Sequence, residues 1–279
     1  MSRGDRIKLK TPAEIETMAE AGRIAAECHQ IMRELVRPGI TTLEIDRACE
    51  DHIRKQGAVP AFQGVLAAGA PFEFPGTICA SVNEEIVHGL PSNRVLKEGD
   101  LFKGDVGVIV RDSRGLGWYS DCAITVPVGS VSDEAHRLME VTREALRRAI
   151  AQVKPGIKLR TVCATIQDYV EGQCGFYCVK EFVGHGLGTS LWEPPQVPNY
   201  VPRGRNAKDL DMKLEVGMVL AIEPMVNIGT ELTARHDDGW TIVTQDGSLS
   251  AHFEHDVAVV EGGHRLLSVP KGAATTIAP

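Results

Sequence analysis

Residues 184–196, GHGLGTSLWEPPQ, place a single histidine between two glycines. Glycine has no Cβ, so another chain segment or a ligand can come close to the imidazole of His185. The alternating glycines also resemble a phosphate-binding loop, but no Walker lysine and serine follow, and no acidic residue stands where a dinucleotide fingerprint requires one. A lone histidine in such a loop is more often structural than catalytic. Its role therefore depends on the acids elsewhere in the chain.

Two aspartates lie in apolar segments on either side of a polar turn. The turn, residues 111–115 (RDSRG), is centred midway between Asp105 and Asp121. A hairpin closing there is expected to put the two carboxylates directly opposite each other, with Cβ atoms about 4.5–5.5 Å apart. Like charges that close are unfavourable unless they are protonated or neutralised by a cation. The spacing therefore predicts a metal site.

Two glutamates repeat the pattern in the second half of the chain. Glu223 lies in the apolar run MVLAIEPMV, and the midpoint between it and Glu254 is Asp238-Gly239, a strong turn dipeptide. The hairpin between them needs additional residues. Taken singly, each acid could be a solvated charge at the end of a strand, but apolar surroundings would leave a buried charge uncompensated. We expect the four acids to converge with His185.

One imidazole and four carboxylates form an oxygen-rich ligand set without thiolate. Such a set suits Mn²⁺, Fe²⁺, Co²⁺ or Zn²⁺ in a catalytic site better than a structural zinc site, which prefers sulfur. Five ligands exceed the needs of one small ion. The sequence therefore predicts two divalent metal ions, about 3.5–4 Å apart, of the kind that activate water for hydrolysis.

Hydrophobic periodicity predicts the elements that position these residues. Residues 11–36 begin with Thr11-Pro12, followed by Glu14 as in a capping box, and carry one apolar stripe, so they are expected to form a long helix. A second helix is expected at 42–55 and a loop at 58–76. Short strands are expected at three further segments, which are residues 77–83, 101–110 and 121–128.

The second half of the chain repeats the plan of the first. The segment VRPGI at 36–40 matches VKPGI at 153–157, and each lies between two helical patterns. Two further matches, in the same order, superpose Asp105 on Glu223 and Asp121 on Glu254. A repeat of this length indicates a duplicated architecture.

Composition restricts the class of protein. The 279 residues are 43% hydrophobic and 24% charged with a net charge of −7, which is typical of a globular protein and argues against nucleic acid as the main ligand. We expect no membrane span and no secretory signal, and therefore a cytoplasmic location. The seven cysteines are scattered without a C-x-x-C pair, so neither a disulfide framework nor a zinc ribbon is expected.

The chain resembles the type I methionine aminopeptidases of the pita-bread metallopeptidase group. The resemblance runs from Thr11 to about Val260 and is carried by specific motifs, which are NEEIVHGLP at 83–91, Gly99-Asp100 through Asp105, WYSD at 118–121, GHGLG at 184–188, IEPMVN at 222–227 and SAHFEH at 250–255. It implies an α+β pita-bread fold with pseudo-twofold duplicated halves, about 21–130 and 138–262, and a central antiparallel sheet covered by helices. It also implies one catalytic domain at 11–279 after an N-terminal extension at 1–10.

The resemblance also implies roles for individual residues. The metal ligands would be Asp105, Asp121, His185, Glu223 and Glu254, with Asp121 and Glu254 bridging both ions. Glu223 would also take the proton of the bridging water, and His88 would contact the substrate near its N-terminus. Phe74, Cys79 and Trp240 resemble the wall of a methionine side-chain pocket. Implied partners are N-terminal Met peptides and nascent chains, with the ribosome as a candidate partner of a monomeric enzyme.

One residue departs from the family pattern HGxGxxxHExP. Trp192 stands where the second histidine, which contacts the substrate around the scissile amide, is expected. Indole donates one N–H but cannot accept a proton or titrate. Three readings therefore stand: a working methionyl aminopeptidase, an aminopeptidase of altered N-terminal selectivity, and a catalytically weakened paralogue that binds peptides or ribosomes. An Xaa-Pro dipeptidase is less expected, because such enzymes usually carry a separate N-terminal domain.

Overall fold

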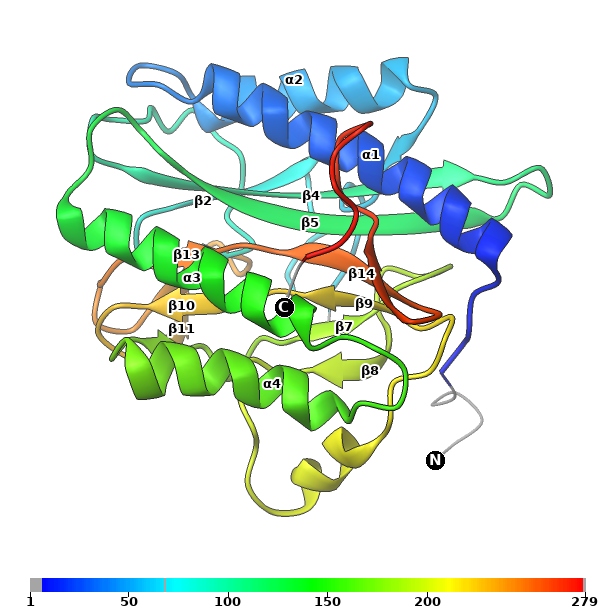
Figure 1. Ribbon diagram of the computed structural model, residues 1–279. Helices are drawn as coiled ribbons and strands as arrows, with labels where there is room; N and C mark the ends of the chain where they lie inside the picture. The colour runs from blue at the N-terminus through cyan, green and yellow to red at the C-terminus, as the bar shows by residue number, and fades with distance from the viewer. Residues whose placement is uncertain (1–6, 68, 278–279) are drawn as a thin grey trace.

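The computed structural model (Figure 1) describes residues 7–67 and 69–277, apart from the side chains of residues 205 and 206. Most of the expected N-terminal extension, residues 1–6, lies outside this range. The helices are α1 (Pro12–Leu35), α2 (Thr42–Lys55), α3 (Asp133–Ala151) and α4 (Leu159–Gln167), with a π-helical segment at Asp168–Gln173 and a 3₁₀ segment at Gly204–Asp211.

The first two helices begin as their sequences predict. The Thr11 hydroxyl accepts a hydrogen bond from the backbone N–H of Glu14 at 3.3 Å, and the Glu14 carboxylate accepts one from the Thr11 N–H at 2.9 Å. Thr41 and Glu44 form the same reciprocal pair at the start of α2. Each pair satisfies N–H groups that have no partner within the helix. The predicted helices at 11–36 and 42–55 are confirmed to within one residue at each end.

The strands of the described residues form four antiparallel sheets. They are β1 (Val59–Pro60), β2 (Ile78–Val82), β3 (Glu85–Val87), β4 (Leu101–Arg111), β5 (Gly117–Pro127), β6 (Tyr177–Cys178), β7 (Gly184–Gly186), β8 (Glu193–Val197), β9 (Val219–Ile222), β10 (Met225–Asn227), β11 (Thr233–Arg235), β12 (Ile242–Thr244), β13 (Ser250–His252), β14 (His255–Val260) and β15 (Gly263–Leu266). The largest sheet has the order β15-β14-β9-β7-β8, and β4 pairs with β1, β2 and β5.

The helices cover the strands as two related pairs (Figure 1). Helix α1 packs on β4 and β5 with α2 beside it, while α3 packs on β10 and β13 with α4 beside it. The turns VRPGI and VKPGI link the members of the two pairs, as the repeat predicts. Alternate side chains of β4 and β5, such as Val106 and Cys122, lie in the core under the helices. Asp105 and Asp121 therefore project from the other face.

The register of the β4–β5 hairpin differs from the prediction. Asp105 pairs with Ala123 and Asp121 pairs with Gly107, so the expectation that the two aspartates lie directly opposite each other is wrong. The cause is the turn, in which the Asp112 side chain accepts hydrogen bonds from the N–H groups of Arg114 and Leu116. The stagger is two residues, so both carboxylates remain on one face. Because the two aspartates are diagonal neighbours, their Cα atoms are expected to lie about 7–8 Å apart.

The second hairpin is formed by β9 and β14. Its last pair joins Ile222 to His255, which brings Glu223 and Glu254 to the same end of the two strands. The additional residues between them include the β11–β12 hairpin, as expected for a long insertion. Its turn is fixed by Asp238, whose carboxylate accepts hydrogen bonds from the N–H groups of Trp240 and Thr241 at 2.8 Å.

Within residues 7–67 and 69–277, no helix is long and apolar enough to cross a membrane. The seven cysteines are all free thiols, and each except Cys174 is buried.

Candidate metal centre and its cavity

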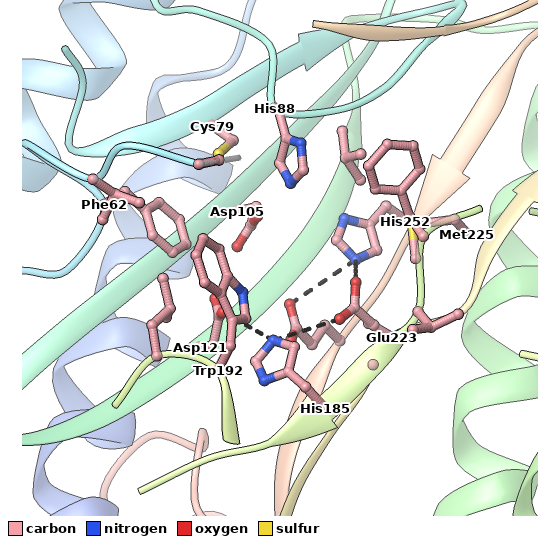
Figure 2. Close-up of a pocket in the computed structure, with 18 of the residues that line it drawn as sticks. Phe62, Cys79, His88, Asp105, Asp121, His185, Trp192, Glu223, Met225 and His252 are labelled. Carbon is pink, nitrogen blue, oxygen red and sulfur yellow. Dashed lines mark ion pairs between the residues drawn. The ribbon is translucent and has the colours of Figure 1, made fainter. Parts of the chain in front are cut away.

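The five predicted ligands come together on the walls of one cavity of about 510 Å³ (Figure 2). They reach it from separate elements: Asp105 from β4, Asp121 from β5, His185 from β7, Glu223 from the end of β9, and Glu254 from the link between β13 and β14. The backbone N–H of Glu254 donates to the carbonyl of Ala123 at 2.9 Å, which ties the two hairpins together beside the site.

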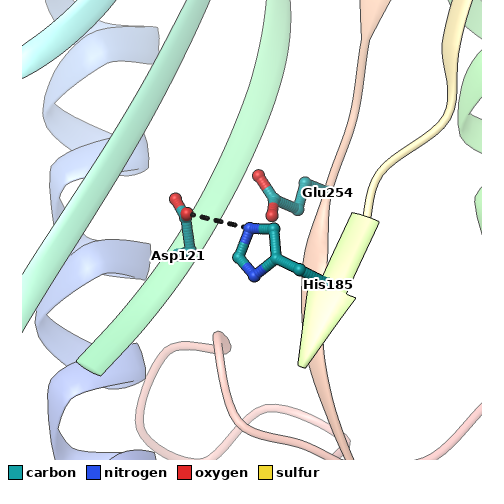
Figure 3. A group of neighbouring side chains, drawn as sticks. All are labelled: Asp121, His185 and Glu254. Carbon is teal, nitrogen blue, oxygen red and sulfur yellow. Dashed lines mark ion pairs between the residues drawn. The ribbon is translucent and has the colours of Figure 1, made fainter. Parts of the chain in front are cut away.

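His185 presents one nitrogen to the acids. Its Nδ1 donates to the carbonyl of Gly186 at 3.0 Å, so Nε2 carries the lone pair of the neutral ring. Nε2 lies 3.7 Å from Asp121 Oδ2 and 3.7 Å from Glu223 Oε1. The ligand atoms of Asp121, His185 and Glu254 all lie within 4.8 Å of one another (Figure 3). This arrangement suits a shared cation.

Burial shifts the pKa values of all five groups towards their neutral forms. Removal from water raises the pKa of Asp105 to about 7 and that of Glu223 to about 8. Burial, followed by repulsion from the neighbouring acids, raises the pKa of Asp121 and Glu254 well above the ordinary range. Burial lowers the pKa of His185 to about 4. The acids must therefore hold protons or share a positive ion.

Unpaired oxygens show that a divalent cation fits this site. Asp105 Oδ1, Asp121 Oδ1 and Glu254 Oε1 are buried without a hydrogen-bond partner among the described residues. Buried polar atoms of this kind need a partner, and a divalent ion supplies one to several carboxylates at once. Asp256 holds Asp121 in place, because its carboxylate accepts hydrogen bonds from the Ser120 hydroxyl at 2.5 Å and from the Asp121 N–H at 3.0 Å.

The alternating glycines around His185 have a steric role. A Cβ on Gly184 would lie 2.3 Å from the carbonyl oxygen of Ala221, and one on Gly186 would lie 2.2 Å from that of Pro194. These contacts come from β9 and β8, which flank β7 on either side. The glycine pattern that resembles a phosphate loop is thus required by close strand packing beside His185.

Gly186→Ala is expected to destabilise the fold and to loosen His185. The new methyl group meets backbone atoms that cannot rotate away, and overpacking of this kind costs about 1–3 kcal/mol. Urea denaturation should show that loss, with weaker metal binding by calorimetry. Gly172→Ala is the matched control, because its Cβ would meet nothing within 4 Å. Equal stability of both variants would contradict the steric account.

The predicted pocket residues also line the cavity. Phe74, Cys79, His88, Trp192 and Trp240 are all on its walls. The Phe74 and Trp240 rings meet edge to face with centroids 5.0 Å apart, and the indole N–H of Trp240 donates to the carbonyl of Phe72 at 3.0 Å. Cys79 pairs directly with Asp105 across β2 and β4. The apolar wall therefore begins next to the predicted metal ligands.

His88 is held in a strained conformation at the cavity wall. Its φ of 60° is in the left-handed region, which is uncommon for a residue other than glycine and is concentrated at functional sites. The ring packs edge to face on Phe182 and Trp240, and burial lowers its pKa to about 4. His88 thus presents a neutral imidazole to the cavity.

Trp192 lies at the rim of the cavity and is 54% exposed. Its neighbour Glu193 points inwards, where it forms a buried ion pair with Lys10 at 2.8 Å and accepts a hydrogen bond from the Thr189 N–H at 2.9 Å. The ion pair fixes the backbone next to the tryptophan. Because the indole itself is exposed at the rim, it can contact a ligand that enters the cavity.

Sequence reasoning missed a further histidine of the cavity wall, His252. Its ring is buried, and Nε2 lies 3.7 Å from Glu223 Oε2 and 3.9 Å from Glu254 Oε2. The motif SAHFEH contains it, but no role follows from that motif. The available signal is its spacing of two residues from Glu254, because residues i and i+2 of a strand share a face. Phe62, Phe182 and Met225, also unforeseen, add to the apolar lining.

The cavity and its carboxylate–imidazole cluster define a metal-dependent hydrolase. The sequence matches metallopeptidase family M24 over residues 16–261, and the chain belongs to this family.

Methionine aminopeptidases of several bacteria are similar in sequence to this protein along almost the whole chain. The chain is 45% identical to methionine aminopeptidase 1 of Bacillus subtilis over 259 residues, covering 93% of this chain and 98% of the relative. It is 43% identical to the methionine aminopeptidase of Clostridium perfringens, covering 95% and 100%. The crystal structure of methionine aminopeptidase from Thermotoga maritima superposes with a TM-score of 0.86 at 40% identity, covering 95% and 100%. The expected α+β pita-bread fold is confirmed.

Proposed function

We propose that this protein is a methionyl aminopeptidase that removes the N-terminal methionine from peptides and nascent proteins. The observation that carries the proposal is the position of the ligand cluster, which lies in a cavity of about 510 Å³ with an apolar wall beginning at the acids themselves. A site of this form receives one side chain and brings the adjoining peptide bond to the metals.

Two divalent ions, of Mn, Fe, Co or Zn, would be held by the five ligands, which are Asp105, Asp121, His185, Glu223 and Glu254. When bound, the ions activate a water molecule and polarise the scissile carbonyl. The oxygen-rich donor set and the unpaired buried oxygens support this assignment.

The remaining chemistry belongs to the side chains. Glu223 accepts a proton from the attacking water and delivers it to the nitrogen of the leaving amide. His88 contacts the substrate near its N-terminus. The carboxylates around the ions attract the free α-amino group, which selects for chain ends.

Selection for methionine follows from the pocket wall. Phe74, Cys79 and Trp240 are each at most 5% exposed, and Phe62 and Leu191 line the same cavity. An unbranched, polarisable thioether fits an aromatic wall of this kind better than a β-branched or charged side chain. The wall therefore favours a long apolar residue at the first position of the substrate.

The direct test is an assay of the purified protein with added Mn²⁺, Co²⁺ or Fe²⁺. Met-Ala-Ser is compared with Leu-Ala-Ser, Ala-Ala-Ser and Xaa-Pro peptides, and release of free methionine is followed. Preferential, metal-dependent cleavage of the methionyl peptide supports the proposal. Absence of metal-dependent release from every peptide would leave a peptide-binding paralogue as the better description.

Metal binding should be linked to pH and to stability. Asp105 and Glu223 have pKa values of about 7 and about 8 in the folded protein. Between about pH 4 and about pH 8 they therefore bind more protons in the folded state than in the unfolded state. The stability of the metal-free protein accordingly falls as the pH rises through that window. Cations replace those protons. Thermal melts with Co²⁺ at about 100 times its Kd should show about 2.7 kcal/mol of stabilisation. At one fixed Co²⁺ concentration, the increase in Tm should be larger at pH 8 than at pH 6, because fewer protons compete for the acids, and the reverse order would count against metal ligation by these acids.

The proposal also assigns a cellular location and an oligomeric state. Residues 11–279 act as one catalytic domain of a monomer in the cytoplasm, where new chains leave the ribosome. Sedimentation of the purified protein alone and with ribosomes tests both points. A stable dimer, or its presence outside the cytoplasm in fractionated cells, would contradict this assignment.

A further inference from the structure

Glu223 lies between two imidazoles that approach its two oxygens separately (Figure 2). Oε1 lies 3.7 Å from Nε2 of His185, and Oε2 lies 3.7 Å from Nε2 of His252. Both separations exceed a direct hydrogen bond. His252 Nε2 is buried, with no hydrogen-bond partner in the described part of the chain. A buried nitrogen aimed at a ligand carboxylate requires an explanation.

The two sides of Glu223 are not equivalent. Within the described residues, the tight cluster of possible ligand atoms contains Asp121, His185 and Glu254, and His252 is not part of it. Oε1 lies on the side of His185, and Oε2 lies on the side of His252, whose Nε2 is also 3.9 Å from Glu254 Oε2. Carboxylates that bind metal are commonly hydrogen-bonded at their outer oxygen, and this contact sets their orientation.

We propose that His252 is a positioning residue that donates its Nε2–H to Oε2 of Glu223 and so fixes the orientation of this carboxylate. The inference rests on the proposed function, in which Glu223 both binds metal and carries the proton. Closing the gap from 3.7 Å to about 2.7–2.9 Å, the length of a charge-assisted hydrogen bond, needs a movement of about 1 Å. We expect a rotation of the Glu223 side chain to provide it.

The backbone around His252 holds the donor in place. Its N–H donates to the Thr125 hydroxyl at 2.9 Å, and that hydroxyl donates to the His252 carbonyl at 2.8 Å. His252 also pairs with Met225 across β13 and β10. Because the ring is 2% exposed, it has little room to turn. Glu223, which is less buried, is the partner that adjusts.

The contact between His252 and Glu223 should matter more in this chain than in one with the family's second histidine. Trp192 stands in place of that histidine, so the rim on the His185 side of the cavity lacks an imidazole, whereas His252 places one behind Glu223. Indole cannot share a proton with the substrate, so more of the proton handling rests on Glu223. A carboxylate that performs this step alone gains more from a fixed orientation.

The test compares His252→Gln with His252→Asn. Both introduce the same amide, but the glutamine amide nitrogen reaches about as far as His Nε2, whereas the asparagine side chain is one methylene shorter. We expect His252→Asn to lower kcat on Met-Ala-Ser by about 10- to 100-fold with little change in KM, and His252→Gln to recover most of the loss. Thermal melts establish that both variants fold.

Co²⁺ absorption spectroscopy gives a readout that does not depend on turnover. The d–d bands should change in His252→Asn and remain close to wild type in His252→Gln, with the number of bound Co²⁺ ions unchanged in both. If the His252→Asn variant has the same spectra and the same kcat as the wild-type protein, the proposal is overturned. Loss of one Co²⁺ ion in His252→Gln would also overturn it, because His252 would then be a ligand.

Failure of the proposed function would look different. A wild-type protein that binds Co²⁺ but releases no methionine contradicts the aminopeptidase activity, while the spectra of the two variants still decide the role of His252. A wild-type protein that binds no Co²⁺ overturns both inferences.

Discussion

Replacement of Glu223 by glutamine should lower kcat/KM for Met-Ala-Ser by about 10²–10⁴, the usual contribution of a positioned acid or base. Glutamine keeps the size of the side chain and one oxygen for a metal, but it cannot accept the proton of the attacking water. The wild-type carboxylate can take up that proton and return it to the leaving amine. Most of the loss should therefore appear in kcat.

Stopped assays over a range of peptide concentrations separate kcat from KM, and metal analysis shows how many ions each variant retains. Glu261→Gln is the matched control, because Glu261 is exposed on the turn between β14 and β15. It should behave as wild type. Near-normal turnover of the Glu223→Gln variant would mean that another group carries the proton, and His88 would be the first candidate.

The local elements of the fold could be predicted because their signals are local. Helix α1 follows from a capping box and an apolar stripe that need no knowledge of the partner. The register of β4 and β5 could not be predicted in the same way. Placing the turn midway between Asp105 and Asp121 takes no account of the Asp112 side chain, which accepts hydrogen bonds from two backbone N–H groups and shifts the centre of the turn.

The convergence of the four acids and His185 on one cavity could be predicted because acids in apolar strands are costly without a counter-charge. His252 and Asp256 escaped prediction for a physical reason. Their function depends on the side chains they face, and Asp256 faces Ser120 and Asp121 from a different hairpin. Sequence spacing fixes the face of a strand but not what lies opposite that face. The glycines around His185 were ambiguous for the same reason, since the carbonyls they avoid belong to β8 and β9.

Trp192→His should raise turnover of methionyl peptides, by up to about 10²-fold, the effect usually attributed to one hydrogen-bond donor on developing charge. A histidine at this position can donate to the substrate and titrate, whereas indole only donates. The substitution should fold without cost, because Trp192 is 54% exposed and the adjoining Glu193 remains anchored by Lys10.

Trp192→Phe separates chemistry from size, since it keeps an aromatic ring at the rim and removes the N–H. If indole donates to the substrate, phenylalanine should lower kcat below wild type while histidine raises it. If the tryptophan only shapes the entrance, both substitutions should change KM and the preference among Met, Leu and Ala peptides with little effect on kcat. A rate that is unchanged or lower in Trp192→His would mean that the site is built around indole. If His252 compensates for the missing imidazole at the rim, Trp192→His combined with His252→Asn should lose less activity than His252→Asn alone.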